Sequence, residues 1–363
     1  MGKVLISGGG RCNVTNTISD PKQLVKNYPR GFDKLQPCFE RFSSDDTQQW
    51  FEDRGVRLKT ESDGRVFPVS DDSSSIADTL QREAHRLKVK INYKTRAVGF
   101  EPQGDQWLIK TNLNDVVADL LVIATGGSPA IWKALEKLDL NIVAPVPSLF
   151  TFHAKHKLLE DLAGISFPNA TVKILTTKTD QSGPILITHE GISGPAVLKL
   201  SAWAARELHE LNYKCVIRVN WLGIDAKQLK AAIVNEQETN PKKHVINRPV
   251  MDIPKRFWQR VCELSDITKN RNYAEIGKKQ IAKLTELLLN CDLTISGKST
   301  NKDEFVTAGG VDLDEIDFDT FAVKKYKNLF MAGEVLNIDA VTGGFNFQAA
   351  WTGGWIIGKQ VVG

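Results

Sequence analysis

His189 and Glu190 are adjacent in the stretch THEGISGP, where Pro195 suits the first turn of a helix that follows the loop. A histidine can take or give a proton near neutral pH, and a neighbouring group can orient it. Oxidation of a C–H or C–N bond needs such a base or orienting group, so His189 is a candidate catalytic residue. A histidine with only a structural role in the loop is the alternative.

Cys12 is a second candidate for chemistry, because a thiolate can take part in redox reactions. The other cysteines, Cys38, Cys215, Cys262 and Cys291, are far apart, and no C-x-x-C pair occurs. A packed, inert thiol is therefore the alternative for Cys12. The five cysteines form neither a disulfide framework nor a zinc-site spacing, and we expect no metal site.

Three consecutive glycines, Gly8 to Gly10, occur in LISGGGRCNVTN. A dinucleotide fingerprint, G-x-G-x-x-G, follows a strand and opens a helix whose free N–H groups meet a pyrophosphate. Here the following residues, such as Asn13 and Thr15, are poor formers of a helix interior, and no Gly-Lys-Ser/Thr follows. The stretch therefore predicts no phosphate loop. The glycines instead favour a backbone that passes close to something flat or bulky.

Two apolar runs end in glycine in the manner of buried parallel strands, DLLVIATGG (119–127) and NLFMAGE (328–334). After the second run, Gly344 precedes a helix-like segment, 345–362, whose N-terminus is the positive end of its dipole. Open α/β sheets bind ligands at the carboxyl ends of their strands, so these turns predict a cofactor cleft. The alternative is that the glycines serve only tight turns and helix packing.

Composition places the chain among ordinary globular proteins, with 363 residues, 42% hydrophobic and 25% charged. The net charge of +4 is mildly basic and demands no nucleic-acid partner. No apolar run approaches the length of a membrane span, and the first residues do not resemble a signal peptide. We therefore expect a protein of the reducing cytoplasm without a membrane partner.

The order of elements predicts an α/β fold in several parts. Helix-like and strand-like segments alternate early in the chain: 71–87 and 129–140 are helix-like, and 89–101, 106–112 and 119–127 are strand-like. Short β-like runs then dominate, followed by a basic helical segment. We expect a Rossmann-like FAD-binding domain in two segments, with its first βαβ unit absent, interrupted by a β-barrel-like module with a helical insert. The predicted boundaries are 1–147 and 307–363 for the two segments, 148–224 and 291–306 for the barrel-like module, and 225–290 for the insert.

Five segments together carry a family resemblance: LISGGGRCNVTN (5–16), GRVFPVSD (64–71), THEGISGPAVLKLS (188–201), KDEFVTAGGVDLDEID (302–317) and AGEVLNIDAVTGGFNFQAAWTGGW (332–355). From residue 2 to its end, the chain resembles the BaiN-like (YhiN-type) flavoproteins, described as NAD(P)/FAD-dependent oxidoreductases. The resemblance implies an enzyme that transfers a hydride between FAD and a small organic substrate, with NAD(P)H as a candidate electron donor. The flavin would supply the chemistry, and the protein would supply positioning and electrostatics.

The resemblance also assigns residues to the cofactor site. Arg11 would neutralise phosphate, and Arg65 would reach the substrate, with a surface role as the alternative for Arg65. Val98 would meet the adenine, with a core-strand role as the alternative. The residues implied to line the cofactor are Gly9, Gly10, Arg11, Cys12, Asn13, Val98, Ala124, Thr125, Gly126, Gly333, Glu334, Gly344, Phe345, Asn346 and Gln348.

The chain departs from the family pattern at its start. Family members begin with a strand, a G-x-G-x-x-G turn, a helix and a second strand before the segment that resembles GKVLISGGGRCNVTN. We therefore expect the unit that holds the ADP half of FAD to be missing, because the start is mis-assigned, because the chain is a fragment, or because another chain supplies that unit. An upstream segment or a second chain is thus a candidate partner. Without the unit, neighbouring strands would expose unpaired edges.

Three functional hypotheses follow. An FAD-dependent oxidoreductase leads, and a truncated, inactive chain that binds no FAD is the second; the colour of the purified protein separates these two. The third is a nucleic-acid-binding module built on 225–290. It has little support from the sequence, because Asp and Glu interleave with the Lys and Arg of that segment.

Overall fold

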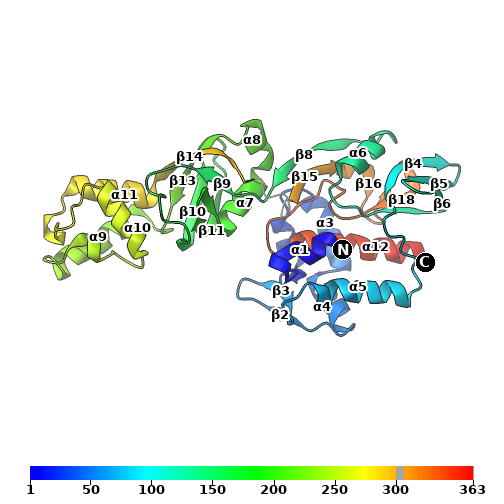
Figure 1. Ribbon diagram of the computed structural model, residues 1–363, viewed down its shortest axis with the longest axis horizontal. Helices are drawn as coiled ribbons and strands as arrows, with labels where there is room; N and C mark the ends of the chain where they lie inside the picture. The colour runs from blue at the N-terminus through cyan, green and yellow to red at the C-terminus, as the bar shows by residue number, and fades with distance from the viewer. Residues whose placement is uncertain (300–305, 363) are drawn as a thin grey trace. The chain divides into compact units, whose positions relative to one another are not determined.

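The computed structural model describes residues 1–299 and 306–362 (Figure 1). The chain folds as two compact units. Unit 1 comprises Met1–Ser148 and Asn301–Gly363, and unit 2 comprises Leu149–Thr300. Unit 1 is thus formed by both ends of the sequence, and unit 2 by its middle.

Unit 1 combines helices with several small sheets. Its helices are α1 (Gly2–Gly10), α2 (Pro21–Leu24), α3 (Phe32–Arg41), α4 (Ser44–Glu52), α5 (Ser74–Arg86), α6 (Pro129–Glu136) and α12 (Phe345–Val362). Its strands are β1 (Thr15–Asn16), β2 (Leu58–Thr60), β3 (Arg65–Pro68), β4 (Ala97–Gln103), β5 (Gln106–Thr111), β6 (Val116–Ala118), β7 (Leu121–Ile123), β8 (Ile142–Ser148), β15 (Val306–Val311), β16 (Ile316–Asp317), β17 (Ala322–Val323) and β18 (Tyr326–Met331). In the described residues the strand orders are β1-β3-β2, β15-β8, β16-β17-β18-β7 and β4-β5-β6.

Local sequence explains where these helices begin. Ser43 and Asp46 form a capping box at the start of α4, and Pro129 occupies the first turn of α6. The helices predicted over 71–87 and 129–140 are confirmed as α5 and α6. In α12, a Cβ on Gly353 would lie 3.0 Å from Ala332, so close packing explains that glycine.

The strand predicted over 89–101 is wrong in its first half, because β4 begins only at Ala97. Lys88 and Lys94 have positive φ angles of 57° and 58°, which interrupt an extended run. Tyr93 is 71% exposed and buries no face against a neighbouring strand. Alternation of residue types predicts a strand only where a partner strand is present to receive it.

The two apolar runs that end in glycine pair with each other in the structure. β7 and β18 pair in parallel, with Leu121 opposite Leu329 and Ile123 opposite Met331, so their carboxyl ends lie together. Within the described residues β7 ends its sheet and is paired on one side only. Val122 is 42% exposed, so the prediction that this strand is buried on both faces is wrong.

Unit 2 contains a closed β-barrel with the strand order β10-β11-β12-β9-β14-β13. The strands are β9 (Phe152–Ala154), β10 (Ser166–Ile174), β11 (Asp180–Ile187), β12 (Gly191–Ser193), β13 (Cys215–Asn220) and β14 (Cys291–Lys298), and α7 (Pro195–Trp203) and α8 (Ala205–Glu210) follow β12. Alternate residues such as Val172 and Ile174, or Ile185 and Ile187, are fully buried. The predicted fold class, an α/β protein with a β-barrel-like module, is confirmed.

The helical insert lies between β13 and β14. It consists of α9 (Ala226–Thr239), α10 (Lys255–Leu264) and α11 (Lys278–Leu289), which pack against one another (Figure 1). Phe257 and Trp258 of α10 are fully buried, as are Ile233 of α9 and Leu284 of α11. Among the residues described, no helix is both long and apolar enough to cross a membrane.

Candidate functional site

Segments far apart in the sequence meet at the carboxyl ends of β7 and β18. A Cβ built on Gly126, after β7, would lie 4.0 Å from the carboxylate oxygen Oε2 of Glu334, after β18. Lys3 of α1 lies 3.7 Å from the same oxygen. The structure therefore brings together the predicted residues Gly126 and Glu334. It adds Lys3, a cation that no local pattern singled out.

The turn before α12 packs directly on β1. A Cβ on Gly344 would lie 2.4 Å from the carbonyl oxygen of Thr15, and its φ is 88°, so only glycine fits. With its amide oriented to satisfy its neighbours, Asn13 accepts from the Gly344 N–H at 2.8 Å and donates to the Thr15 carbonyl at 3.0 Å. Trp351 Nε1 donates to the Val14 carbonyl at 3.0 Å. The loop after the glycines and the start of α12 thus form one joint.

Gln348 lies inside this joint and is fully buried. Its Oε1 accepts from the Thr15 hydroxyl at 2.6 Å, and its Nε2 donates to Thr352 Oγ1 at 3.1 Å. The Thr352 hydroxyl donates in turn to the Phe42 carbonyl at 2.9 Å. Both ends of the amide have a protein partner, so this side chain fixes the helix, and its contact with a cofactor stays a prediction.

Phe345 and Asn346 also have structural roles. The Asn346 amide accepts from the N–H of Ala340 at 2.9 Å and donates to its carbonyl at 3.1 Å, which closes the loop before α12. Phe345 is buried, and its carbonyl accepts from the Tyr28 hydroxyl at 2.6 Å. These two side chains shape the turn, so any contact with a cofactor there would come from the backbone.

Arg11 faces the β2–β3 hairpin. Its Nη1 lies 2.7 Å from Glu61 Oε1 and 3.6 Å from Asp71 Oδ1, and its guanidinium lies 4.0 Å from the Phe67 ring centroid. The hydrogen bond to Glu61 is the largest cause that raises the pKa of Arg11. Two carboxylates therefore already neutralise this charge, and its geometry does not support the predicted contact with phosphate.

Arg65 belongs to the same network. Its Nη2 lies 2.7 Å from Glu61 and its Nε 2.7 Å from Asp63. The two arginines share Glu61 and both lie over the Phe67 ring. The guanidinium of Arg65 is thus engaged by carboxylates, and its role in holding a substrate stays a prediction.

The remaining predicted residues of unit 1 lie near its surface. Gly9 and Gly10 have positive φ angles of 69° and 82°, and a Cβ on either would meet no atom within 4 Å. Ala124 and Thr125 are exposed after β7. Val98 is 51% exposed, so the core-strand alternative for it is wrong, and its contact with an adenine stays a prediction. Gly333 has a φ of 77° at the end of β18, as a tight turn requires.

Asn337 follows Glu334 by three residues, and its backbone N–H donates to the Val311 carbonyl at 2.9 Å. Its Oδ1 is buried and has no hydrogen-bond partner in the described part of the chain. Such an orphan acceptor costs about 1–3 kcal/mol, so an N–H or O–H donor from a ligand would be favourable. The open glycines and the adjacent strand ends leave room for the flat ring of a flavin, and Asn337 adds an unsatisfied acceptor three residues after Glu334.

No described segment offers the phosphate loop of a dinucleotide site. The triple glycine forms the end of α1, where Ser7, Gly8 and Gly9 have non-helical backbone angles, and α2 begins only at Pro21. The prediction that these glycines are not a dinucleotide fingerprint is confirmed.

The chain matches the model of the HI0933-like protein Rossmann domain over residues 1–360. The chain belongs to the HI0933-like family. The resemblance to BaiN-like flavoproteins is thereby confirmed. The expectation that the chain belongs to a family of oxidoreductases is confirmed as well.

Curated relatives of this HI0933-like chain are similar over nearly all of it. It is 27% identical to the ribosomal RNA dihydrouridine synthase of Escherichia coli, over 99% of this chain and 89% of the relative. It is 27% identical to the 3-dehydro-bile acid delta(4,6)-reductase of Clostridium scindens, over 98% and 89%. The ribosomal RNA dihydrouridine synthase of Haemophilus influenzae is also 27% identical, over 96% and 87%. A solved structure of CtdE in complex with FAD is 9% identical over 87% of this chain and 68% of that one, with a TM-score of 0.29, too weak a likeness to define the fold.

In unit 2 of the HI0933-like chain, the histidine placed beside a carboxylate is His153. Its Nε2 lies 3.0 Å from Glu190 Oε2, although without the angle of a hydrogen bond. Pairing of β9 with β12 puts His153 opposite Gly191. His189 is exposed and has neither a hydrogen bond nor an ion pair within the described residues. Adjacency in sequence singled out His189, whereas only the strand pairing could have found His153.

Cys12 is a packed thiol in the HI0933-like chain, which agrees with the alternative of a packed, inert thiol given above. It is fully buried beside Val4 and Val14, and burial raises its pKa to about 11. A thiol with that pKa carries almost no thiolate near neutral pH, so the prediction of a catalytic Cys12 is wrong. In residues 1–299 and 306–362 no cluster of three His, Cys, Asp or Glu residues could hold a metal.

We expect Cys215 alone to react with a chromogenic disulfide reagent under native conditions. Cys12, Cys38, Cys262 and Cys291 are buried, whereas Cys215 is partly exposed. Burial raises the pKa of Cys215 to about 11, so its reaction is slow at neutral pH and accelerates as pH rises toward that value. Native protein should release one equivalent, unfolded protein five, and Cys215→Ser native protein none. Two fast equivalents from native protein would contradict this assignment.

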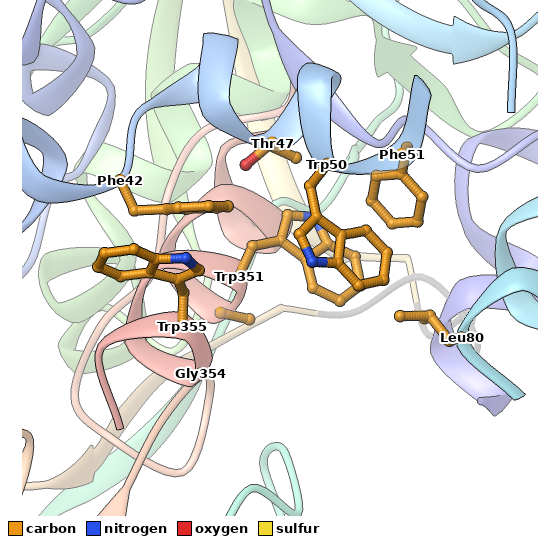
Figure 2. A pocket seen from close by; sticks show the side chains of 9 residues that line it. Phe42, Thr47, Trp50, Phe51, Leu80, Trp351, Gly354 and Trp355 are labelled. Carbon is orange, nitrogen blue, oxygen red and sulfur yellow. The ribbon is translucent and has the colours of Figure 1, made fainter. Parts of the chain in front are cut away.

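An apolar pocket of about 350 Å³ lies elsewhere in unit 1 (Figure 2). Aromatic rings of α4 and α12, including Trp50, Trp351 and Trp355, form its walls, and Figure 2 shows the Trp355 ring beside that of Phe42. Its volume is at the lower end for small-molecule sites. None of the predicted site residues lines it, and no charged side chain does.

Proposed function

We propose that this chain is an FAD-dependent reductase that saturates a C=C bond conjugated to a carbonyl group. The names of the relatives support this chemistry. A dihydrouridine is a uridine whose ring C=C bond, conjugated to a carbonyl, has gained two hydrogen atoms. A delta(4,6)-reductase of a 3-dehydro-bile acid acts on C=C bonds conjugated to a 3-keto group. In both cases a hydride at one carbon and a proton at its neighbour complete the reaction.

The paired ends of β7 and β18, where Gly126, Glu334 and Lys3 come together, carry the proposal. The flavin, when bound and reduced, supplies the hydride. A Cβ on Gly9 or Gly10 would meet no atom within 4 Å, and Asn337 Oδ1 has no hydrogen-bond partner in the described residues, so both are open to a ligand. The first turn of α12 contains no acidic residue, so the positive end of its dipole is free to stabilise negative charge on the ring.

Uracil in RNA is the substrate that we favour. Two of the three relatives are named for ribosomal RNA, and this chain has a net charge of +4. A polycyclic ketone is the second candidate, because the aromatic pocket of unit 1 suits a flat apolar molecule. NAD(P)H is the electron donor that we propose for either substrate.

Anaerobic reduction assays test the proposal on the full chain. We expect the purified protein to take up FAD and NAD(P)H to bleach the flavin absorbance. A uridine-containing RNA should then restore the absorbance and gain the mass of two hydrogen atoms per reduced base. Reoxidation by a 3-keto-4,6-diene steroid, and not by RNA, would favour the second substrate. A protein that stays colourless with excess FAD would contradict the proposal as a whole and favour the inactive chain.

A further inference from the structure

The helical insert carries the whole net positive charge of the chain. Residues 225–290 hold thirteen Lys and Arg against eight Asp and Glu, whereas the remainder holds 34 against 35. The two signs alternate along the sequence, so only the folded arrangement shows where positive charge collects.

Two segments of the insert lack acidic residues altogether, 239–251 and 267–274. They are hydrogen-bonded to each other through their backbones. The Val245 N–H donates to the Arg271 carbonyl at 3.0 Å, and the Tyr273 N–H donates to the Lys243 carbonyl at 3.1 Å. We call residues 241–245 and 269–274 the paired loops.

The paired loops bring four cations together, Lys242, Lys243, Lys269 and Arg271. The three lysines are exposed, and Arg271 is half-buried. Among the described residues, no carboxylate lies within 4.0 Å of any of the four. Other cations of the insert are paired: Arg248 lies 2.6 Å from Glu236, and Lys283 lies 2.5 Å from Asp266. The charge of the paired loops is therefore left for a partner.

Buried aromatic residues hold the paired loops in place. Trp258 Nε1 donates to the Val245 carbonyl at 2.7 Å, and the Tyr273 hydroxyl donates to the Arg248 carbonyl at 2.5 Å. Both rings are fully buried. The cations thus stand on a supported platform, which lowers the entropic cost of holding them against a ligand.

We propose that the paired loops bind the phosphate backbone of an RNA substrate. The proposal rests on the proposed function, because that RNA carries the base to be reduced. Lys and Arg side chains provide most phosphate contacts, and the exposed amides of Asn247 and Asn270 are further donors of the kind that contact RNA backbones. A lipid surface is not favoured: in the described insert only Val234 and Met251 are large exposed hydrophobic residues, too few for an interfacial stripe.

Binding of a labelled single-stranded, uridine-containing RNA to the full chain, read by fluorescence anisotropy, tests the proposal. The variant is Lys242→Gln, Lys243→Gln, Arg271→Gln. Three lost phosphate contacts should lower affinity at least tenfold at about 0.1 M salt and reduce the slope of log affinity against log salt by about two. The matched control, Lys214→Gln, Lys227→Gln, Lys230→Gln, removes the same charge from exposed lysines outside the paired loops and should change affinity less than about threefold.

An equal loss in both triple variants would overturn the proposal, because net charge alone would then explain binding. Wild-type binding to vesicles of phosphatidylserine and phosphatidylcholine, with none to RNA, would also overturn it. Circular dichroism of each variant shows whether the insert is still folded. Because anisotropy needs neither flavin nor turnover, RNA binding without reductase activity would contradict the proposed function while leaving the paired loops as an RNA site.

Discussion

Asp339→Ala is expected to destabilise unit 1 by about 3–5 kcal/mol, the usual loss when one partner of a buried ion pair is removed. Asp339 is fully buried and pairs with Arg30, whose side chain is only 14% exposed. The Ser148 hydroxyl also donates to Asp339 Oδ2 at 2.8 Å. The substitution leaves a buried guanidinium without its carboxylate. Hydrogen exchange of unit 1 peptides measures the loss without assuming that both units unfold together.

Two further variants show whether burial of the charge is the cause. Asp314 forms an ion pair with Lys34 at 3.4 Å but is 85% exposed, so Asp314→Ala should cost less than about 1 kcal/mol. Replacing both members of the buried pair, Arg30→Met with Asp339→Leu, removes the orphan charge and should recover most of the stability. Equal losses from Asp339→Ala and Asp314→Ala would show that the buried pair has no special weight.

Patterns that depend on near neighbours in the sequence predicted much of this fold. The helix at 345–362, the two glycine-ended strands and the barrel-like module all follow from apolar periodicity and turn residues. The segment before Ala97 shows the limit of that reasoning. It alternates like a strand, but a strand needs a hydrogen-bonding partner, and no sequence pattern reports whether a partner exists.

The candidate site was harder to predict, because its decisive contacts join distant parts of the chain. The sequence shows that Arg11 could bind phosphate, but not that its guanidinium donates to Glu61. It shows that Gln348 could contact a cofactor, but not that its amide oxygen accepts from the Thr15 hydroxyl. Resemblance named loops and residues for the cofactor, but it could not say which of their side chains already have hydrogen-bond or ion-pair partners within the protein. The orphan acceptor of Asn337 is likewise visible only after every neighbouring donor has been placed.

The paired loops show the same limit for charge. Along the sequence, Asp and Glu dilute the Lys and Arg of the insert, which argued against a nucleic-acid partner. In the fold, Glu236 and Asp266 are taken up by Arg248 and Lys283. The net charge of a segment is therefore a poorer guide to a nucleic-acid partner than the charges that remain unpaired in the fold.

Gly344→Ala is expected to open the joint between β1 and α12 at a cost of about 2–5 kcal/mol and to weaken FAD binding at least tenfold. A left-handed conformation costs a non-glycine residue about 1–2 kcal/mol, and overpacking adds about 1–3 kcal/mol. The new Cβ would lie 2.4 Å from the Thr15 carbonyl, a backbone atom that cannot rotate away. Moving the turn at residue 344 away from Thr15 also breaks the hydrogen bond from the Gly344 N–H to Asn13.

Two glycines within α12 show whether a steric clash or a loss of backbone flexibility causes the effect of Gly344→Ala. Gly358→Ala meets no atom within 4 Å and should be neutral or stabilising by up to about 1 kcal/mol, with FAD affinity unchanged. Gly353→Ala brings a Cβ to 3.0 Å from Ala332 and should fall between the two. Flavin fluorescence titration reads affinity, and hydrogen exchange in the first turn of α12 reads the joint itself. Wild-type affinity and wild-type protection in Gly344→Ala would contradict this prediction. The joint would then accommodate the added methyl group, and other contacts would position the N-terminus of α12.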